Sequence, residues 1–452
     1  MEYYAKSKKV QFTSERINEI KKNMKNIEEC LKENLTETDI EILNSSITDI
    51  AEKTEEKQKT LKEHHKDIVT CAEMFFLEYG EYFTEKEKKL VVEACRIHDL
   101  GKVNLVFQAM ICPKLAEKFY IDVRKTQQIP HGFLSAVTIS LDEFDDLSEL
   151  FSDKDFGPFI TAVYYHHDRE DHYNSPAIRK YAEKYYMKQI EEYLNRKIRK
   201  LNCSNLDDLL FRNNVYTGKY IPDSNAWKEY LLIKGLLNKF DYTVSAGYEN
   251  AESVIDLHEK KLVKNIEKFL NGKELRPAQK FMKMNRDKNL IVIAPTGSGK
   301  TEASLLWMNG EKSFYTLPLK VSSNAIYLRI KENYEYKDVA LLHSDAMAVY
   351  LREYNGNEDI GEKYERSKML SQPLTVCTVD QLFRFVYRAL GTEIFAATLK
   401  YSKLVLDEIQ AYEPRVIATI IYGLKMIQEM GGKFAIITAT FPPVLKYFME
   451  QY

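Results

Sequence analysis

The chain has 452 residues, and its 65 Lys and Arg against 67 Asp and Glu give a formal net charge of −2. This length suggests about three domains, and the near balance of charge excludes a global basic field for nucleic acid, so any such contact needs a local patch. A hydrophobic content of 44% excludes a disordered chain, and only 17 Gly and 12 Pro indicate few long loops.

The sequence offers no sign of secretion, membrane insertion or disulfide bonding. The six cysteines form no CxxC pair, which argues against a zinc ribbon and a disulfide framework. The N-terminus is charged rather than apolar, and no run approaches the roughly 18 apolar residues of a membrane helix. We therefore expect a soluble cytoplasmic protein with no membrane partner.

The first half of the chain has helical periodicity. Residues 1–60 are rich in Lys, Glu and Asn and predict a helical N-terminal extension. Residues 61–250 predict an all-α domain, because apolar positions recur at helical spacing and almost nothing alternates with period two. Within it we expect helices from residue 61 onward and over 90–100, 159–167 and 231–244.

The second half predicts an α/β domain over residues 262–452, with a boundary between residues 248 and 275. Short β-rich runs are separated by helical stretches, a rhythm typical of a mainly parallel sheet. The predicted strands are 290–294, 313–317, 339–342, 374–378, 403–406 and 434–438. The expected fold class is multidomain, with the all-α domain followed by the α/β domain.

A phosphate-binding loop follows the first predicted strand. It matches G-x-x-x-x-G-K-[ST] with Ala in place of the first Gly, in the run Ala294, Pro295, Thr296, Gly297, Ser298, Gly299, Lys300 and Thr301. Glycines let backbone N–H groups turn toward phosphate oxygens. Lys300 would reach the β- and γ-phosphates, and the Thr301 hydroxyl would bind Mg²⁺.

An acidic pair at the end of the fifth strand supplies the second part of this site. Asp407 would complete the magnesium shell, and Glu408 would orient or deprotonate the attacking water. The alternative is a chance Gly-rich turn with a surface acidic pair. The placement of both motifs at strand ends favours a site for ATP and Mg²⁺.

The segment Asp407-Glu408-Ile409-Gln410 resembles the DExH/DEAD box of superfamily 2 helicases, with Gln410 in place of His or Asp. The resemblance extends to the strand-contacting segments 316–319 and 377–381 and to the coupling segment 438–440. It implies a RecA-like fold, and it assigns Gln279, in Arg276-Pro277-Ala278-Gln279, to the adenine of the nucleotide.

The chain has nine histidines, and four of them form two adjacent pairs, His64-His65 and His166-His167. Imidazoles and carboxylates from several helices can converge on one or two ions such as Mn²⁺, Fe²⁺, Ni²⁺ or Zn²⁺, and two close ions can clamp a phosphodiester. Lys102, in His98-Asp99-Leu100-Gly101-Lys102, either neutralises a phosphate, braces the metal shell, or is an ordinary solvated lysine.

The order His, His-Asp, further His and a late Asp resembles the HD superfamily of metal-dependent phosphohydrolases. Helical spacing leaves the first ligand open between His64 and His65. The resemblance assigns catalysis to His98 and Asp99, with Lys102 beside them, and it implies these metal ligands: His64 or His65, His98, Asp99, His131, His166, His167 and Asp241.

An HD domain ahead of a superfamily 2 core resembles the CRISPR-associated nuclease-helicase of type I systems. The pattern L-x-x-H, from Leu61 to His64, then favours His64 as the first ligand. The family implies cleavage of single-stranded DNA with a divalent metal (Mn, Fe, Ni, Co or Mg) in the HD site. It also implies ATP-driven movement along that strand, with Mg in the helicase site, after recruitment by an RNA-guided surveillance complex.

The sequence stops shortly after Thr440, where a second RecA-like domain with its arginines would begin. We therefore expect that this chain lacks the second domain, which would be supplied in cis by the full-length protein or in trans. Without that domain, we expect the chain to bind nucleotide weakly and to hydrolyse it poorly. Two alternatives stay open. One is an HD-type nucleotide phosphohydrolase with an accessory P-loop ATPase; the other is a scaffold with vestigial histidines.

Overall fold

The computed structural model describes residues 3–5, 59–139, 156–167, 175–199, 201–203, 225–253, 255–353 and 360–451. The chain divides into two compact units. The first comprises Met1–Lys66, Asp99–Thr138 and Tyr173–Cys203, and the second comprises Asp67–His98, Ile139–His172 and Ser204–Tyr452. Most of the predicted extension over 1–60 lies outside the described residues, and the domain boundaries at 61–250 and 262–452 stay predictions.

The described part of the first unit is helical. A single antiparallel bridge joins Tyr4 to Thr60, just before α3 begins. The Asn104 side chain starts α5 by accepting a hydrogen bond from the Phe107 N–H at 2.9 Å, as a helix N-cap does. The helices are α3 (Leu61–Tyr79, entering the second unit), η2 (Leu100–Val103), α5 (Leu105–Ile111), α6 (Pro113–Lys118), α7 (His131–Thr138), α10 (Ser175–Tyr185) and α11 (Met187–Leu194).

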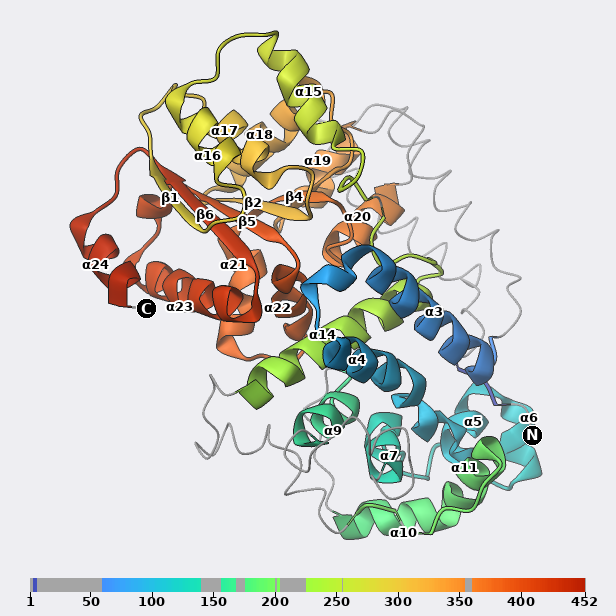
Figure 1. The fold of residues 1–452 in the computed structure, drawn as a ribbon. Helices are drawn as coiled ribbons and strands as arrows, with labels where there is room; N and C mark the ends of the chain where they lie inside the picture. The colour runs from blue at the N-terminus through green and yellow to red at the C-terminus, as the bar shows by residue number, and fades with distance from the viewer. Residues whose placement is uncertain are drawn as a thin grey trace, which may run out of the picture. The chain divides into compact units, whose positions relative to one another are not determined.

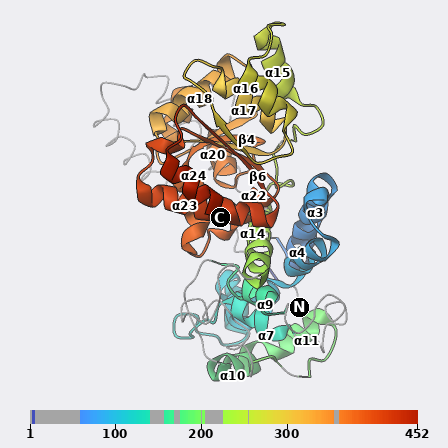
Figure 2. The same cartoon turned by 60° about the vertical axis from the view of Figure 1, so that its left-hand side comes forward.

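The second unit contains further helices of the first half of the chain, η1 (Gly80–Tyr82), α4 (Glu85–Ile97), α9 (Phe156–Tyr164), α14 (Asn225–Ser245) and α15 (Lys261–Leu270). Thr84 and Glu87 form a capping box that starts α4. Helix α14 packs on α4, α9 and α22 (Glu393–Lys400), and it lies beside α22 in both views (Figures 1 and 2).

Three predicted helices exist with shifted ends. The helix expected over 90–100 is α4, which begins at Glu85 because of its cap and ends at Ile97, with His98 as its C-cap. The helix expected over 159–167 is α9, Phe156–Tyr164, and the one expected over 231–244 is the longer α14, Asn225–Ser245. Among the described residues, no helix combines the length and apolar character needed to cross a membrane.

The second half of the chain forms one six-stranded sheet in the order β1-β6-β5-β2-β4-β3, in which every neighbouring pair is parallel. The strands are β1 (Leu290–Ile293), β2 (Ser313–Leu317), β3 (Val339–Leu342), β4 (Leu374–Thr378), β5 (Lys403–Asp407) and β6 (Lys433–Thr438). Each predicted strand is confirmed to within one residue at either end. Strands β2 to β5 are buried along their whole length, as covered parallel strands are.

Helices cover both faces of the sheet (Figure 1). One face is covered by α16 (Pro277–Met284), α17 (Lys300–Met308), α18 (Lys320–Glu332) and α19 (Ala346–Glu353), whose buried side chains, Trp307 and Tyr327 among them, form one apolar core with the strands. The other face is covered by α22, α23 (Pro414–Met430) and α24 (Pro443–Gln451), and the remaining elements are α20 (Ile360–Lys368), α21 (Val379–Leu382), η3 (Phe383–Tyr387) and η4 (Ile409–Ala411). The expected fold class, a helical region followed by a parallel α/β domain, is confirmed.

Candidate functional site

In the first unit, Gly101 holds the turn after Asp99 directly against α7. A Cβ on Gly101 would lie 2.0 Å from the backbone oxygen of His131, so no other residue fits there without moving the backbone. The Gly101 N–H donates to the Ser135 hydroxyl at 2.8 Å, and that hydroxyl donates to the His131 carbonyl at 2.9 Å. This close contact brings Asp99 beside His131.

The Asp99 carboxylate is the centre of a buried polar cluster in the first unit. Its Oδ1 lies 3.1 Å from His131 Nε2, and its Oδ2 lies 3.3 Å from His64 Nε2. Lys102 Nζ donates to Oδ2 at 2.6 Å. We call His64, Asp99, Lys102 and His131 the carboxylate half of the site; all four are buried.

The carboxylate half bears on two questions that the sequence left open. Lys102 is only 7% exposed and braces Asp99, so its interpretation as a solvated lysine is wrong. His64 is fully buried and faces Asp99, whereas His65 is partly exposed and its Nδ1 lies 3.2 Å from the Tyr193 hydroxyl. The geometry therefore favours His64 over His65 as a ligand.

In the second unit, His98, His166 and His167 form what we call the imidazole half. The rings of His98 and His166 pack edge to face with their centroids 5.0 Å apart, and the ring centroids of His166 and His167 are 4.2 Å apart. His98 Nδ1 lies 3.0 Å from the Cys95 carbonyl, and His166 Nδ1 lies 2.7 Å from the Val163 carbonyl. Since a carbonyl only accepts, both Nδ1 atoms donate, and both Nε2 atoms keep the lone pair that a metal requires.

Asp241 lies on α14 and is 6% exposed. Its Oδ1 accepts a hydrogen bond from the Ser245 hydroxyl at 3.1 Å. Burial, with the nearby Cys71 and Asp241, raises the pKa of the Cys95 thiol, one turn before His98. Among the described residues, some possible ligand atoms lie within 4.8 Å of one another, including those of Asp99 and His131 and those of His166 and His167. Asp241 belongs to none of these groups.

The two halves are joined covalently. His98, of the imidazole half, and Asp99, of the carboxylate half, are consecutive residues, and the chain passes from one unit to the other at their peptide bond. Consecutive Cα atoms are about 3.8 Å apart. Each half presents metal-binding atoms, nitrogens of neutral imidazoles in one and a carboxylate with imidazoles in the other.

The predicted phosphate loop lies between β1 and α17 in the second unit. Gly297 and Gly299 adopt φ values of +79° and +82°, in the left-handed region that favours glycine. Gly299 is the N-cap of α17, whose first residue is Lys300. Of the other loop residues, Ala294 is buried at the end of β1, and three are exposed or partly exposed, namely Pro295, Thr296 and Ser298.

Gln279 lies against this loop, as the predicted adenine contact should. Its Oε1 accepts from the Arg276 N–H at 3.0 Å, and its Nε2 donates to the Gly299 carbonyl at 3.4 Å. The Arg276 guanidinium also contacts the Gly297 carbonyl. These residues, with Lys300, Thr301 and others, line a cavity of about 490 Å³.

Asp407 is the last residue of strand β5 and Glu408 follows it, in contact with Lys300 of the phosphate loop. Lys300 Nζ lies 2.5 Å from Glu408 Oε1. Burial raises the pKa of Asp407, although a hydrogen bond from Tyr315 and the charge of Lys300 act against it. Burial also acts to raise the pKa of Glu408, but hydrogen bonds from Lys300 and Gln410 outweigh it and leave that pKa below its ordinary value.

Gln410 connects the acidic pair to the coupling segment at the end of β6. Its side chain contacts both the Glu408 carboxylate and the Thr438 hydroxyl. Thr438 in turn donates to the Thr440 carbonyl at 2.8 Å. An amide both donates and accepts, so glutamine connects the two segments although it departs from the His or Asp of the helicase pattern.

Sequence reasoning missed one residue of this site. Tyr315 was predicted only as part of a strand, yet its hydroxyl donates to Asp407 Oδ2 at 2.7 Å. Tyr315 pairs with Val405 in the parallel register, two residues before Asp407. Because side chains two apart on a strand share a face, the register between two predicted strands was the signal that could have placed Tyr315 beside Asp407.

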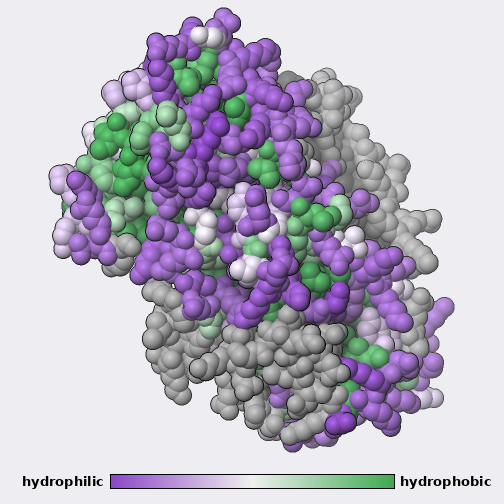
Figure 3. All heavy atoms as spheres, in the orientation of Figure 1, coloured by the Kyte–Doolittle hydropathy of each residue, from purple (hydrophilic) through white to green (hydrophobic). Residues whose placement is uncertain are grey.

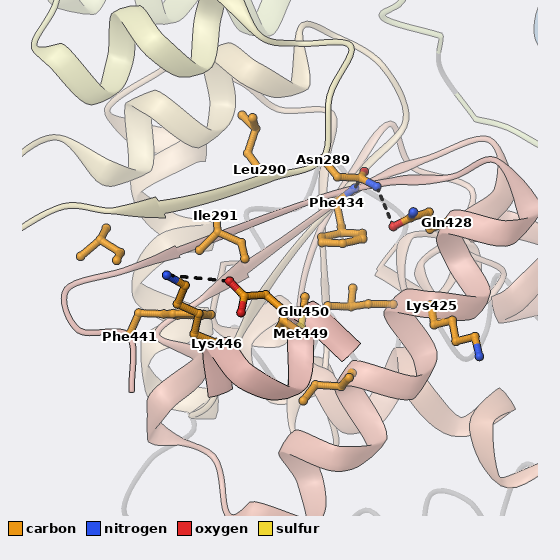
Figure 4. A pocket seen from close by; sticks show the side chains of 13 residues that line it. Asn289, Leu290, Ile291, Lys425, Gln428, Phe434, Phe441, Lys446, Met449 and Glu450 are labelled. Atoms are coloured by element: carbon orange, nitrogen blue, oxygen red, sulfur yellow. Dashed lines mark hydrogen bonds and ion pairs between the residues drawn. The ribbon is translucent and has the colours of Figure 1, made fainter. Parts of the chain in front are cut away.

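A second cavity, of about 430 Å³, lies on the opposite face of the sheet, at the β1 edge. Hydrophobic residues gather there on the surface (Figure 3), where Ile293 is 62% exposed. Ile291, Phe434 and Met449 line the cavity, and Asn289 hydrogen-bonds Gln428 at its rim (Figure 4). It contains none of the predicted site residues.

Two family models match this chain. The model described as the HD domain of Cas3 matches residues 51–225, and the DEAD/DEAH box helicase model matches residues 277–448. The first match contains every predicted ligand of the HD site except Asp241, and the second contains the whole predicted nucleotide site.

One curated relative matches most of the chain, and others match about a third of it. A CRISPR-associated nuclease/helicase Cas3 of Methanothermobacter thermautotrophicus is 25% identical over 464 residues, covering 88% of this chain and 54% of the relative. The Escherichia coli CRISPR-associated endonuclease/helicase Cas3 is 24% identical, over 34% of this chain and 20% of the relative. The chain thus spans about half the length of the Methanothermobacter relative and a smaller share of the Escherichia coli relative.

Solved structures share the fold. A crystal structure of T. fusca Cas3-AMPPNP superposes with a TM-score of 0.61 at 18% identity, covering 87% of this chain and 50% of that one. A chain in a CRISPR RNA-guided surveillance complex, in a pre-nicking state, gives a TM-score of 0.50 at 17% identity, covering 87% of this chain and 47% of that one. The chain thus combines a Cas3-type HD domain with a DEAD/DEAH box helicase domain, two domains that indicate a hydrolase, and it is similar to a Cas3 nuclease/helicase over most of its length.

Proposed function

We propose that this chain cleaves single-stranded DNA at a divalent metal centre in the HD domain and couples that cleavage to ATP-driven movement along the strand. The activity would degrade invading DNA in type I CRISPR interference. The observation that supports it most is the pair of half-sites, each built of metal-binding groups, on either side of the His98–Asp99 peptide bond.

We propose that one centre is formed by ligands from both halves and from α14: His64, His98, Asp99, His131, His166, His167 and Asp241. The donor set fits a metal, because in the neutral rings the two Nδ1 hydrogen bonds leave the Nε2 lone pairs for an ion, and Asp99 is a buried carboxylate. Such a mixed nitrogen and oxygen set suits Mn, Fe, Ni, Co or Mg. A bound ion would polarise the phosphodiester and activate water.

The protein groups around this centre have separate roles in the proposal. His98 and Asp99 are the catalytic pair, and the backbone carbonyls of Cys95 and Val163 fix the tautomers of His98 and His166. Lys102 holds the Asp99 carboxylate at 2.6 Å and adds a positive charge where a phosphate would approach.

In the helicase domain, Lys300 would bind the β- and γ-phosphates of ATP, and Thr301 and Asp407 would hold its Mg²⁺. Glu408 would orient the attacking water, since the pKa of this carboxyl is lowered and it stays ionised. We propose that a second RecA-like domain supplies arginines to the phosphates and that an RNA-guided surveillance complex recruits the protein to DNA. The likeness to a chain in a CRISPR RNA-guided surveillance complex supports the recruitment.

Circular single-stranded DNA incubated with Mn²⁺, Ni²⁺ or Co²⁺ and no ATP tests the nuclease. We expect linear and then degraded DNA from the wild type and intact circles from His98→Ala. His258→Ala is the matched control, since His258 is an exposed histidine paired with Glu78. Intact circles under all three metals with a folded wild type would contradict the proposal, and hydrolysis of free deoxynucleotides instead would identify a nucleotide phosphohydrolase.

A further inference from the structure

Tyr315 is a fully buried phenol on β2, next to the predicted magnesium ligand Asp407. Its ring is part of the core between the sheet and α17, with 0% exposure. Its hydroxyl donates to Asp407 Oδ2 at 2.7 Å. A tyrosine needed only for packing could be phenylalanine, so the position of this hydroxyl asks for an explanation.

The hydrogen bond leaves the two oxygens of Asp407 in different situations. Oδ2 is held by Tyr315, while Oδ1 is buried and has no hydrogen-bond partner within the described part of the chain. Asp407 as a whole is 6% exposed. A buried carboxylate oxygen without a partner is unfavourable unless a cation or its water shell approaches it. Fixing one oxygen therefore fixes the direction in which the other is presented.

The ring of Tyr315 packs in one apolar core with α17, the helix that begins at Lys300 directly after the phosphate loop. Thr301, the hydroxyl residue of the G-x-x-x-x-G-K-[ST] loop, is the second residue of that helix. Burial and the Asp407 charge raise the pKa of Tyr315 well above its usual value. Tyr315 therefore packs on the helix that carries one predicted magnesium ligand and hydrogen-bonds the other.

We propose that Tyr315 is a positioning residue for the magnesium of ATP: it orients the Asp407 carboxylate before the ion binds. The assignment rests on the proposed ATP site. Groups that orient metal ligands typically change metal affinity by about 10- to 100-fold when removed. Tyr315 is fully buried and would act on the ion only through Asp407, so its loss should affect the Mg²⁺-dependent part of nucleotide binding alone.

The test is Tyr315→Phe, which keeps the ring and removes the hydroxyl. The affinity of a fluorescent ADP analogue is measured in EDTA and across a Mg²⁺ titration. We expect the Mg²⁺ concentration for half-saturation to rise about 10-fold, with unchanged affinity in EDTA. Tyr327→Phe is the matched control, since Tyr327 is fully buried on α18 and also donates to a carboxylate, Glu353, at 2.8 Å; it should leave the titration unchanged.

Three outcomes would count against the assignment. An unchanged Mg²⁺ titration in Tyr315→Phe would overturn it, as would a loss of affinity equal in EDTA and in Mg²⁺, which indicates a packing role. An equal effect of Tyr327→Phe would do the same. A wild-type chain that binds no nucleotide would contradict the proposed ATP site itself, a result distinct from a binding wild type with an indifferent variant.

Discussion

The two candidate metal sites of this chain are assembled in opposite ways. The nucleotide site is made of short contiguous segments, 294–301 and 407–408, each at the end of a strand of one parallel sheet. The proposed HD site takes its side chains from residues as far apart in the sequence as 64 and 241, on several helices. A site made of contiguous segments is built by local backbone geometry, whereas a site made of distant side chains depends on how helices pack.

The comparison predicts that a substitution in one site abolishes the activity of that site and leaves the other site unchanged. Asp99→Ala should have the largest effect, because it removes the carboxylate that both His64 and His131 face and leaves Lys102 buried beside them. We expect cleavage of circular single-stranded DNA to fall at least 100-fold, on the order expected for loss of a metal ligand. Nucleotide affinity, measured by fluorescence, should not change; a parallel loss of nucleotide binding would show that the sites are not separate.

Lys300→Ala is the converse experiment. Removing the loop lysine takes away the charge expected at the phosphates, so nucleotide affinity should fall by about 10-fold or more, an effect of at least 1.4 kcal/mol. Metal-dependent cleavage without ATP should stay at the wild-type rate. Reduced cleavage in this variant would mean that the nuclease depends on the loop even without nucleotide.

Gly101→Ala tests how strongly the HD site depends on backbone packing. Its Cβ would meet the His131 backbone, so we expect a loss of about 1–3 kcal/mol in the free energy of unfolding, as overpacking causes, with weaker Mn²⁺ binding. Gly80→Ala is the control, because its Cβ would meet only the flexible end of Lys88. Thermal unfolding and Mn²⁺ calorimetry report both effects, and equal behaviour of the two variants would refute the argument.

Ser245→Ala should have the smallest effect. It removes the hydroxyl that donates to Asp241 at 3.1 Å, a neutral-to-charged hydrogen bond worth about 1.5–3 kcal/mol at most. If Asp241 binds the metal, Mn²⁺ affinity should fall several-fold. Ser402→Ala, which removes a hydroxyl bonded only to the Thr398 carbonyl among the contacts described, should leave it unchanged. An unaltered affinity in Ser245→Ala would count against Asp241 as a ligand.

The sequence predicted the sheet well for a physical reason. Buried parallel strands are continuous apolar runs, and their carboxyl ends face one edge, so the sequence alone could place the candidate nucleotide residues Lys300 and Asp407 near each other. Tyr315 was missed because its role depends on strand register, which periodicity does not reveal. Register is a tertiary property.

The buried residues and helix ends of the HD domain were harder to predict from the sequence. Helical spacing placed both His64 and His65 near the buried face; the family pattern favours His64, and the packing around Asp99 agrees with it. Lys102 is buried although lysines are mostly exposed, because an adjacent carboxylate holds it. Helix ends shifted where a cap, such as Thr84 for α4, overrode the apolar pattern.

The central claim is that the carboxylate half and the imidazole half serve one metal centre. Calorimetric Mn²⁺ titration of the wild type, His131→Ala, His166→Ala and the double variant tests it directly, since residues acting on one site show non-additive effects. The account predicts that each single variant weakens the same Mn²⁺ binding and that the double variant loses less than the two losses combined. Two independent classes of site, each abolished by one variant and untouched by the other, would contradict it.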